Sequence, residues 1–365
     1  GFLLHLTLTL ITKKRNGRKM KIALITDQHL DGRKGSLPFW NYFQKFYDNI
    51  FFPVLEKEGI TTVFDLGDTF DNRKSLDYNT FNRVKTNYFE RLKDYKVHMI
   101  LGNHCTYYKN TNKINSPELL LENYENITIY SSPEHITVGG KNFLMMPWIN
   151  SENKKEAVET MKSSNADIMC SHMEVDGFEV TPGMHFDGGF SVSDFKNFDR
   201  VWSGHFHHKS KRGNVQYLGN PYQMYWNDYK DSRGFHIYDT ETDRLKFVRN
   251  PYEIFDKIFY DDAKYDYNKS NVSDYKDKYI KIIVEEKRDY RMFETLVDRL
   301  YNVGAHDVKI VETLVDTDDI DDVDLKTKDT MTLLNEYIDE VDIAVDKSSL
   351  KNVMRSLYIE SCNVG

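Results

Sequence analysis

Six short apolar runs between residues 21 and 204 are the feature that most limits how this chain can fold. In order they read KIALIT, TTVFDL, VHMIL, NFLMMPW, ADIMCS and DRVWSG. Runs this short that are apolar on both faces are typical of strands covered on both sides by other layers. The segments 37–59 and 78–95 between them have the spacing of helices. The sequence therefore predicts an α/β (α+β) fold in which sheet is layered with helices.

The pattern changes towards the C-terminus. VQYLGN, RGFHIYDT and RLKFVRN, which are separated by turn residues, predict antiparallel strands that complete a second sheet. After a stretch rich in Tyr, Asp and Lys, the segment 279–314 predicts a small β-α-β unit. The acidic run 316–324 is typical of a solvated linker. Beyond it, apolar residues at helical spacing predict two amphipathic helices.

Net charge, cysteine content and the N-terminal apolar run each bear on the function or cellular setting of the chain. The formal net charge of −8 gives no support for nucleic-acid binding by overall charge, so local patches, metal ions or a second subunit would have to supply positive potential. The 3 cysteines lie far apart and form no CxxC pair, which favours a reducing, cytoplasmic setting. The apolar run near the N-terminus is too short to cross a bilayer, and we expect no membrane segment.

Five short polar motifs come at or just after the ends of predicted strands. They read D-Q-H, G-D-T-F-D, G-N-H, S-H and G-H-F-H. The side chains that they supply are Asp27, His29, Asp68, Asp71, Asn103, His104, His172, His205 and His207. Because open α/β sheets bind ligands at the carboxyl ends of their strands, we expect residues far apart in the sequence to meet in one crevice.

The ligand types in these motifs suit a pair of divalent metal ions. Two such ions about 3.5–4 Å apart can clamp a phosphoryl group and activate water. Because the ions repel each other, an anionic ligand should bridge them, and Asp68 is central enough to do so. Asp27, His29 and His207 could then complete one site, and the second site could take the remaining ligands, Asn103, His172 and His205. Mixed imidazole and carboxylate ligands favour Mn²⁺, Fe or Zn over Mg²⁺ or Ca²⁺.

The order of the motifs resembles that of the calcineurin-like metallophosphoesterases. The local sequence around the motifs is similar to that of the SbcD-type nuclease family, and most similar to its phage branch. The stretches that carry this resemblance are DQHLDGR, GDTFDNRK, GNHCTYY, MMPW, SHMEVDGF, WSGHFHHK and YLGNPYQ. The resemblance implies a β-sandwich flanked by helices, with a β-α-β capping domain and C-terminal helices. It also implies two divalent ions, most often Mn²⁺ with Mg²⁺, Fe or Zn as alternatives, held by the seven ligands named above. His104 would stabilise the transition state.

The resemblance further implies a function and partners. Members of this family are metal-dependent DNA nucleases, acting as 3′–5′ double-strand exonucleases and single-strand endonucleases, that work with an SMC-like ABC ATPase in recombination and repair. The C-terminal helices would bind that ATPase, a homodimer is expected, and the location would be the cytoplasm, or the host cytoplasm for a phage protein. Two alternatives stay open. One is another calcineurin-like phosphoesterase acting on a phosphoprotein or small phosphoester, and the other is a weakened, DNA-binding or ATPase-regulating scaffold.

Two positions depart from the family pattern. Cys105 stands where the family has an acid after G-N-H, and that acid is expected to orient the histidine or its loop. Asp71 stands where many members carry a histidine, which weakens its claim to catalysis. The residues that could contact DNA follow the second and third motifs and could equally be ordinary surface loops. They are Arg73, Lys74, Tyr107, Tyr108 and Lys109.

The chain is expected to divide into five parts. Residues 1–19 would be an upstream tail, because Met20 followed by KIALIT reads as a natural start. The others are a metallophosphoesterase nuclease domain over 20–250, a capping domain over 251–315, an acidic linker over 316–328 and a helical ATPase-binding segment over 329–365.

Overall fold

The computed structural model describes residues 19–181 and 183–312, together with Ile338, Lys347, Leu350, Lys351, Val353, Met354 and Leu357. The expected tail up to residue 18, the acidic linker and nearly all of the helical segment 329–365 lie outside the described residues. Within the described part, no helix combines the length and the apolar character needed to cross a bilayer.

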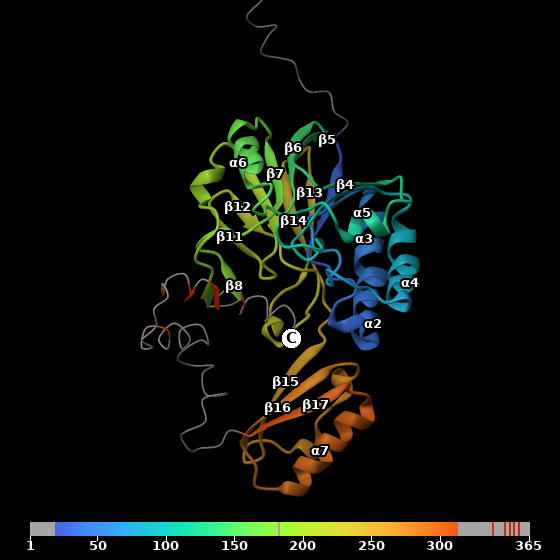
Figure 1. The fold of residues 1–365 in the computed structure, drawn as a ribbon. Coiled ribbons are helices and arrows are strands. Elements are labelled where there is room, and N and C mark those ends of the chain that lie inside the picture. Colours follow the sequence, from blue (N-terminus) through green and yellow to red (C-terminus); the bar gives the residue numbers. More distant parts are fainter. Residues whose placement is uncertain are drawn as a thin grey trace, which may run out of the picture.

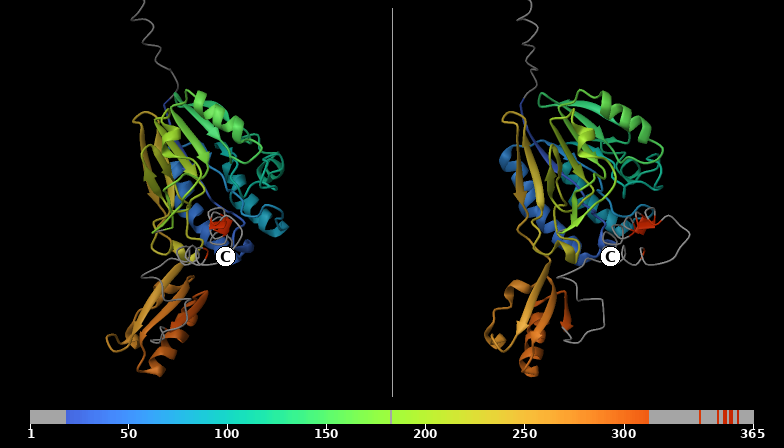
Figure 2. Two further views of the ribbon diagram at one scale, coloured as in Figure 1. Left: turned by 60° about the vertical axis from the view of Figure 1, so that its left-hand side comes forward. Right: turned by 90° about the vertical axis from the view of Figure 1, so that its left-hand side faces the viewer.

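Two six-stranded sheets form the main body (Figures 1 and 2). The first sheet has the order β14 (Arg244–Arg249), β13 (Gly234–Asp239), β1 (Lys21–Ile25), β2 (Thr62–Asp65), β3 (Lys96–Ile100) and β4 (Ile127–Tyr130). The second has the order β11 (Ser210–Arg212), β12 (Val215–Tyr217), β10 (Arg200–Gly204), β7 (Ile168–His172), β6 (Lys141–Met146) and β5 (Glu134–Val138). All six apolar runs form strands, so this part of the prediction is confirmed.

The three later segments form strands, and β13 and β14 pair antiparallel as predicted, but the prediction that all three complete the second sheet was wrong. β13 and β14 extend the first sheet, with β13 antiparallel to β1, while β12 lies in the second sheet and pairs in parallel with β10. The reason is burial: β13 places Phe235 and Ile237 among the helices and Tyr238 between the sheets. A strand that is apolar on both faces is stable only where both faces are covered, and the place beside β1 provides this.

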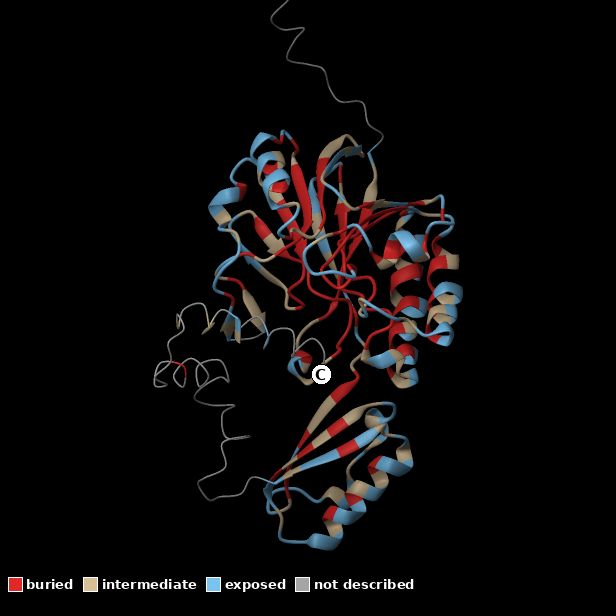
Figure 3. Ribbon diagram, viewed as in Figure 1, coloured by how far each residue is buried: buried red, intermediate tan, exposed pale blue. Residues whose placement is uncertain are grey.

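Side chains from both sheets meet in an apolar layer between them, which makes the body a sandwich. Ile22, Leu24 and Phe64 of the first sheet share one core cluster with Phe143 and Trp202 of the second. Residues pointing the other way from each sheet pack on helices or loops, and most strand residues are fully buried (Figure 3).

Helices cover the outer faces of both sheets (Figure 1). α2 (Leu37–Phe46) and α3 (Phe52–Glu58) occupy the segment predicted as one helix, and a π-helical turn, which was not predicted, joins them. α4 (Tyr78–Asn87) ends earlier than expected and gives way to a 3-10 turn. α5 (Ser116–Leu120) follows the third motif, and α6 (Lys154–Ser163) covers the second sheet. A short hairpin joins β8 (Glu179–Thr181) to β9 (Met184–His185).

A separate three-stranded parallel sheet follows the main body. It contains β15 (Phe255–Asp261), β16 (Tyr279–Glu286) and β17 (Asp307–Glu312), and α7 (Tyr290–Val303) packs against one of its faces. Figure 1 shows this unit below the main body, joined to it through the start of β15. The β-α-β pattern is therefore present, and its use as a cap stays a prediction.

Candidate metal centre

The five motifs meet at one edge of the sandwich because each follows a strand that ends there. Asp27 lies two residues after the end of β1, Asp68 three after β2, Asn103 three after β3 and His205 one after β10, while His172 ends β7. The loops that carry them are among the most buried non-strand segments of the molecule (Figure 3).

An unusual backbone conformation turns several of these side chains inwards. Asp27, His29, Asp68 and His205 have φ values of 50°, 42°, 52° and 91°. Non-glycine residues rarely adopt this left-handed region, and such strain persists only where the surrounding structure enforces it. Backbone hydrogen bonds supply that enforcement, since Asp27 N–H donates to Gly67 O and His29 N–H to Asp68 O, both at 2.9 Å.

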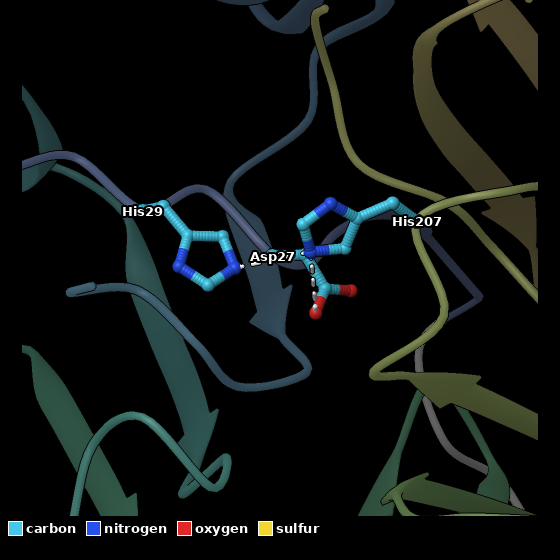
Figure 4. Close-up of side chains that lie close together, drawn as sticks. All are labelled: Asp27, His29 and His207. Atoms are coloured by element: carbon cyan, nitrogen blue, oxygen red, sulfur yellow. Dashed lines mark hydrogen bonds and ion pairs between the residues drawn. The ribbon is translucent and has the colours of Figure 1, made fainter. Parts of the chain in front are cut away.

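Asp27, His29 and His207 form the first cluster of donor atoms (Figure 4). The Nε2 atoms of the two histidines lie 3.2 Å apart, and Nε2 of His207 lies 4.0 Å from Oδ1 of Asp27. All three side chains are buried. Lone pairs of two imidazoles and a carboxylate that converge in this way suit a divalent transition-metal ion.

Asp68, His172, Asn103 and His205 form the second cluster. Nε2 of His172 lies 3.2 Å from Oδ2 of Asp68 and 3.1 Å from Oδ1 of Asn103. The same Asn103 oxygen lies 3.0 Å from Nδ1 of His205. All seven expected ligand residues therefore lie close together, and their division between two metal ions stays a prediction.

Asp68 connects the two clusters. Its Oδ2 lies 3.2 Å from Nε2 of His172 in one cluster and 3.9 Å from Nε2 of His29 in the other. Its Oδ1 accepts a hydrogen bond from the backbone N–H of His104 at 2.8 Å, which fixes the carboxylate. This is the position that a bridging ligand would need.

Further residues behind the ligands fix which ring nitrogen faces the centre. Nδ1 of His172 lies 2.8 Å from the carbonyl oxygen of Leu66 and donates its proton there, so Nε2 is the nitrogen that could offer a lone pair to a metal ion once it is deprotonated. Nε2 of His205 lies 3.3 Å from a carboxylate oxygen of Glu174, which leaves Nδ1 facing Asn103.

Around His207, Asn220 lies 3.5 Å from Nδ1, and the buried Arg233 donates to its carbonyl oxygen. Sequence reasoning assigned no role to Glu174, Asn220 or Arg233. Glu174 and Asn220 stand inside SHMEVDGF and YLGNPYQ, two of the stretches that carried the resemblance.

His104 and Asp71 lie beside the first cluster. Nδ1 of His104 lies 2.8 Å from the carbonyl oxygen and 3.6 Å from the carboxylate of Asp71, and that carboxylate also lies 2.9 Å from Nδ1 of His29. Asp71 therefore contacts the rings of both His104 and His29, and a part for it in catalysis stays a prediction.

Cys105 stands at the position of the family acid, but the contacts to the His104 ring come from Asp71. The thiol is fully buried, and burial together with the nearby Asp68 raises its pKa to about 12, so it stays neutral. Its backbone N–H donates to Gly102 O at 3.2 Å, and its carbonyl accepts from Ser116 N–H at 2.8 Å. These backbone hydrogen bonds hold the loop whatever side chain stands at position 105, and the effect of the missing acid stays a prediction.

The expected DNA contacts lie together on the surface. Lys74 Nζ lies 5.9 Å from the ring centroid of Tyr107, and the rings of Tyr107 and Tyr108 pack edge to face at 4.7 Å. Tyr108 is 51% exposed, Lys109 is exposed and Arg73 is half-buried. Trp148 is half-buried, and its ring centroid lies 5.3 Å from that of His205.

Three glycines of the motifs leave no room for a side chain. A Cβ on Gly102 would lie 2.1 Å from Oδ1 and 2.5 Å from the backbone nitrogen of Asp68. One on Gly204 would lie 2.9 Å from Oδ2 of Asp27, and one on Gly67 would lie 2.7 Å from Nδ1 of His172. The glycines therefore let backbone and ligands approach more closely than any other residue would allow.

Two of the histidines carry a second ring proton, and so a positive charge, in the metal-free protein. Burial alone would lower the pKa of His29, but its hydrogen bond to Asp71 and the charges of Asp71 and Asp68 outweigh burial and raise the pKa to about 9. Asp68 and Asp27 raise the pKa of His172 to about 9 against burial in the same way. Burial and the charge of His29 instead lower the pKa of His207 well below its ordinary value, so His207 is neutral.

We expect metal binding to release about two protons per chain at pH 7.5, because His29 and His172 must each lose one to become ligands. The ion pairs that protonated His29 and His172 make with neighbouring carboxylates stabilise the metal-free fold fully below about pH 6.5, the unperturbed pKa of histidine. This stabilisation is lost as the pH rises through about 9. Mn²⁺ affinity should therefore rise steeply from pH 6.5 to 9.

Calorimetric titrations of Mn²⁺ in buffers of different ionisation enthalpy would count the protons. Release of fewer than about one proton, or activity that stays flat from about pH 8 to about pH 5, would contradict this assignment.

Comparisons with known proteins agree with this geometry. A model of the calcineurin-like phosphoesterase family matches residues 20–209. Exonuclease subunit 1 of Enterobacteria phage T4 is 32% identical over 315 residues, which cover 84% of this chain and 89% of that protein. The fold and the two clusters define a metal-dependent phosphoesterase. The chain belongs to the calcineurin-like phosphoesterase family, and within it is similar to the phage T4 exonuclease subunit.

Solved structures give distant matches. A structure of an archaeal phosphodiesterase is 13% identical, with a TM-score of 0.34, over 63% of this chain and 100% of that one. The nuclease MPE of Pseudomonas putida is 16% identical, with a TM-score of 0.27, over 56% of this chain and 67% of that one. The family assignment rests on the sequence matches.

Proposed function

We propose that this protein is a DNA phosphodiesterase that uses two divalent metal ions, with Mn²⁺ as the preferred metal. It would act as a 3′–5′ exonuclease on duplex ends and as an endonuclease on single strands. The observation that carries the proposal is the place of Asp68 between two clusters of imidazole, carboxylate and amide donors. The similarity to a phage exonuclease subunit supports DNA as the substrate.

The bound ions would polarise the phosphodiester and activate water. Asp27, His29 and His207 would hold one ion, the second cluster would hold the other, and Asp68 would contact both. Side chains beside the metal centre would stabilise the charge that develops on the phosphodiester. Nδ1 of His104 is held by the Asp71 carbonyl, which leaves Nε2 as the nitrogen available to the substrate. An N–H at Nε2 would donate a hydrogen bond to a phosphoryl or leaving oxygen, and the Asp71 carboxylate lies 3.6 Å from Nδ1 on the other side of the ring.

Replacing His104 with glutamine should lower kcat about 100- to 1000-fold, because a donor to the developing charge is lost, while bound metal is unchanged. Asp71→Asn is the matched comparison. It keeps the carbonyl that holds Nδ1, so we expect a loss of only about tenfold and a shift of the pH profile towards lower pH. Steady-state kinetics with metal analysis would measure both, and equal losses of metal and activity in His104→Gln would assign His104 to metal binding.

The direct test of function is cleavage of a labelled DNA duplex in Mn²⁺, compared with hydrolysis of a generic aryl phosphate. Strong DNA cleavage with weak aryl phosphate hydrolysis is the expected result. The reverse would support a phosphoesterase for another substrate. Background activity in both, unchanged by Cys105→Asp, would support the scaffold alternative.

We extend the proposal to partners. The T4 relative is named as a subunit, which supports a second component, and an SMC-like ABC ATPase bound through the segment 329–365 is the component we propose. We also propose a homodimer, DNA contacts from the loops around Arg73 and Tyr107, and activity in the cytoplasm, or in the host cytoplasm for a phage protein. Co-purification of full-length chain with the ATPase, lost on truncation after residue 328, would test the contact.

A further inference from the structure

The face of the small sheet opposite α7 carries a row of three lysines. The strand register pairs Lys257 of β15 with Lys281 of β16, and Lys281 with Lys309 of β17. The residues next to them on each strand point the other way: Ile258, Ile282 and Val308 lie in the core cluster under α7. The three lysines therefore share the face that α7 does not cover.

This row, the lysine row, is unfavourable for the sheet itself. Neighbouring strands lie about 4.8 Å apart, and like charges directly opposite each other on one face destabilise a sheet. Burial and the charge of Lys230 both lower the pKa of Lys257. A bound anion would offset this repulsion.

Aromatic residues of the main body join the lysine row to the metal centre. Lys281 Nζ lies 4.5 Å from the ring centroid of Trp226, and the Nζ atoms of Lys257 and Lys230 lie 4.9 Å and 5.2 Å from that of Tyr229. In the same loop, the ring of Tyr225 stacks on that of His207 at 6.4 Å. The lysine row thus begins one loop away from a proposed metal ligand.

Beyond the lysine row, the same face of the sheet carries partly exposed apolar side chains. The next row in register consists of Phe259, Ile283 and Val311, of which Phe259 is 49% exposed. On the other side of the lysine row, Tyr279 packs on Phe39 of α2 and so fixes the sheet to the main body. The residue paired with Tyr279 on β17 is Asp307, an exposed acid. Cations beside aromatic and apolar side chains suit nucleic acid, whose phosphates need charge and whose bases stack.

We propose that the lysine row is a phosphate-binding track that holds the DNA strand on its way to or from the metal centre. The proposal rests on the proposed function and adds a surface to it. DNA is favoured over an acidic protein segment because the row adjoins the loop that reaches the metal centre, where the substrate must lie.

The test is a triple variant, Lys257→Gln, Lys281→Gln and Lys309→Gln, in the full chain. The matched control changes three lysines of the same unit that pair with carboxylates. They are Lys264, Lys269 and Lys287, which pair with Asp261, Asp266 and Glu312. Fluorescence anisotropy with a labelled duplex would give Kd at several salt concentrations, and bis(p-nitrophenyl) phosphate would report the metal centre alone.

We expect the lysine-row variant to bind DNA about tenfold or more weakly, with the slope of log Kd against log salt reduced by about two to three, since each phosphate contact contributes about 0.9. Its hydrolysis of the small phosphodiester should be unchanged, and its melting temperature equal or higher because the repulsion is removed. The control triple should keep the wild-type salt slope.

An unchanged salt slope in the lysine-row variant, with wild-type cleavage of DNA intact, would overturn this inference and leave the proposed function standing. That result would also be expected if an acidic segment occupied the row. A wild-type protein that hydrolyses the small phosphodiester but neither binds nor cleaves DNA would overturn both.

Discussion

Replacing Asp68 with asparagine is expected to reduce phosphodiester hydrolysis by about a thousandfold or more, because the change removes the negative charge shared by both metal clusters. In the folded protein, burial works to raise the pKa of Asp68, but the neighbouring His172 and His104 hold it well below its ordinary value. The carboxylate is therefore ionised. An amide of the same shape cannot offset the repulsion between two cations.

Metal content and activity should be measured together for this variant. We expect fewer than about two Mn²⁺ ions per chain at concentrations that saturate the wild type. Asp65→Asn is the matched control, because Asp65 is also buried and close by but is held by Thr69 and Gln28. Burial raises its pKa to about 7, so this carboxyl is already partly neutral, and we expect less than about a tenfold loss. Full metal content in Asp68→Asn would rule out the bridging role.

Replacing Gly102 with alanine should be nearly as damaging, although Gly102 donates no ligand atom. Its new methyl group would lie 2.1 Å from Oδ1 and 2.5 Å from the backbone nitrogen of Asp68, and the second contact cannot be relieved by turning a side chain. The Asp68 loop must move, and displacements of about 1 Å at a reacting centre cost about a hundredfold in rate. We expect loss of bound metal, measured by elemental analysis, with a lowered melting temperature.

Gly59→Ala is the control for this substitution. Gly59 ends α3 with a φ of 66° and has open space around its Cβ position. Alanine there should cost about 1 kcal/mol of stability from backbone strain and leave metal content unchanged. A metal content in Gly102→Ala equal to that in Gly59→Ala would show that the Asp68 loop tolerates the methyl group.

That the expected ligand residues meet could be predicted because each of them stands within a few residues of a strand end. Asp27 and His172 follow or end apolar runs, so strand prediction alone placed them at one edge of the sheets. Glu174 and Arg233 were missed because they act through His205 and His207 rather than on a metal, and such contacts depend on three-dimensional packing that no spacing encodes.

The error in the sheets has a related cause. Strands that follow one another in the sequence usually pair, so β12, β13 and β14 were expected in one sheet. In the folded chain, the loop between β12 and β13 crosses from the second sheet to the first, and this loop carries Tyr225 and Trp226. The segment that sequence reasoning passed over is therefore the one that connects His207 to the small sheet.

The left-handed backbone at four of the metal-centre residues has a consequence for the lifetime of the protein. Each such residue costs about 1 kcal/mol or more, which bound cations would offset by stabilising the folded form alone. A cell short of the metal that the site binds would then hold more of this chain in partly opened forms, which proteases degrade. Nutrient supply would set how much of the protein survives as well as how fast it works.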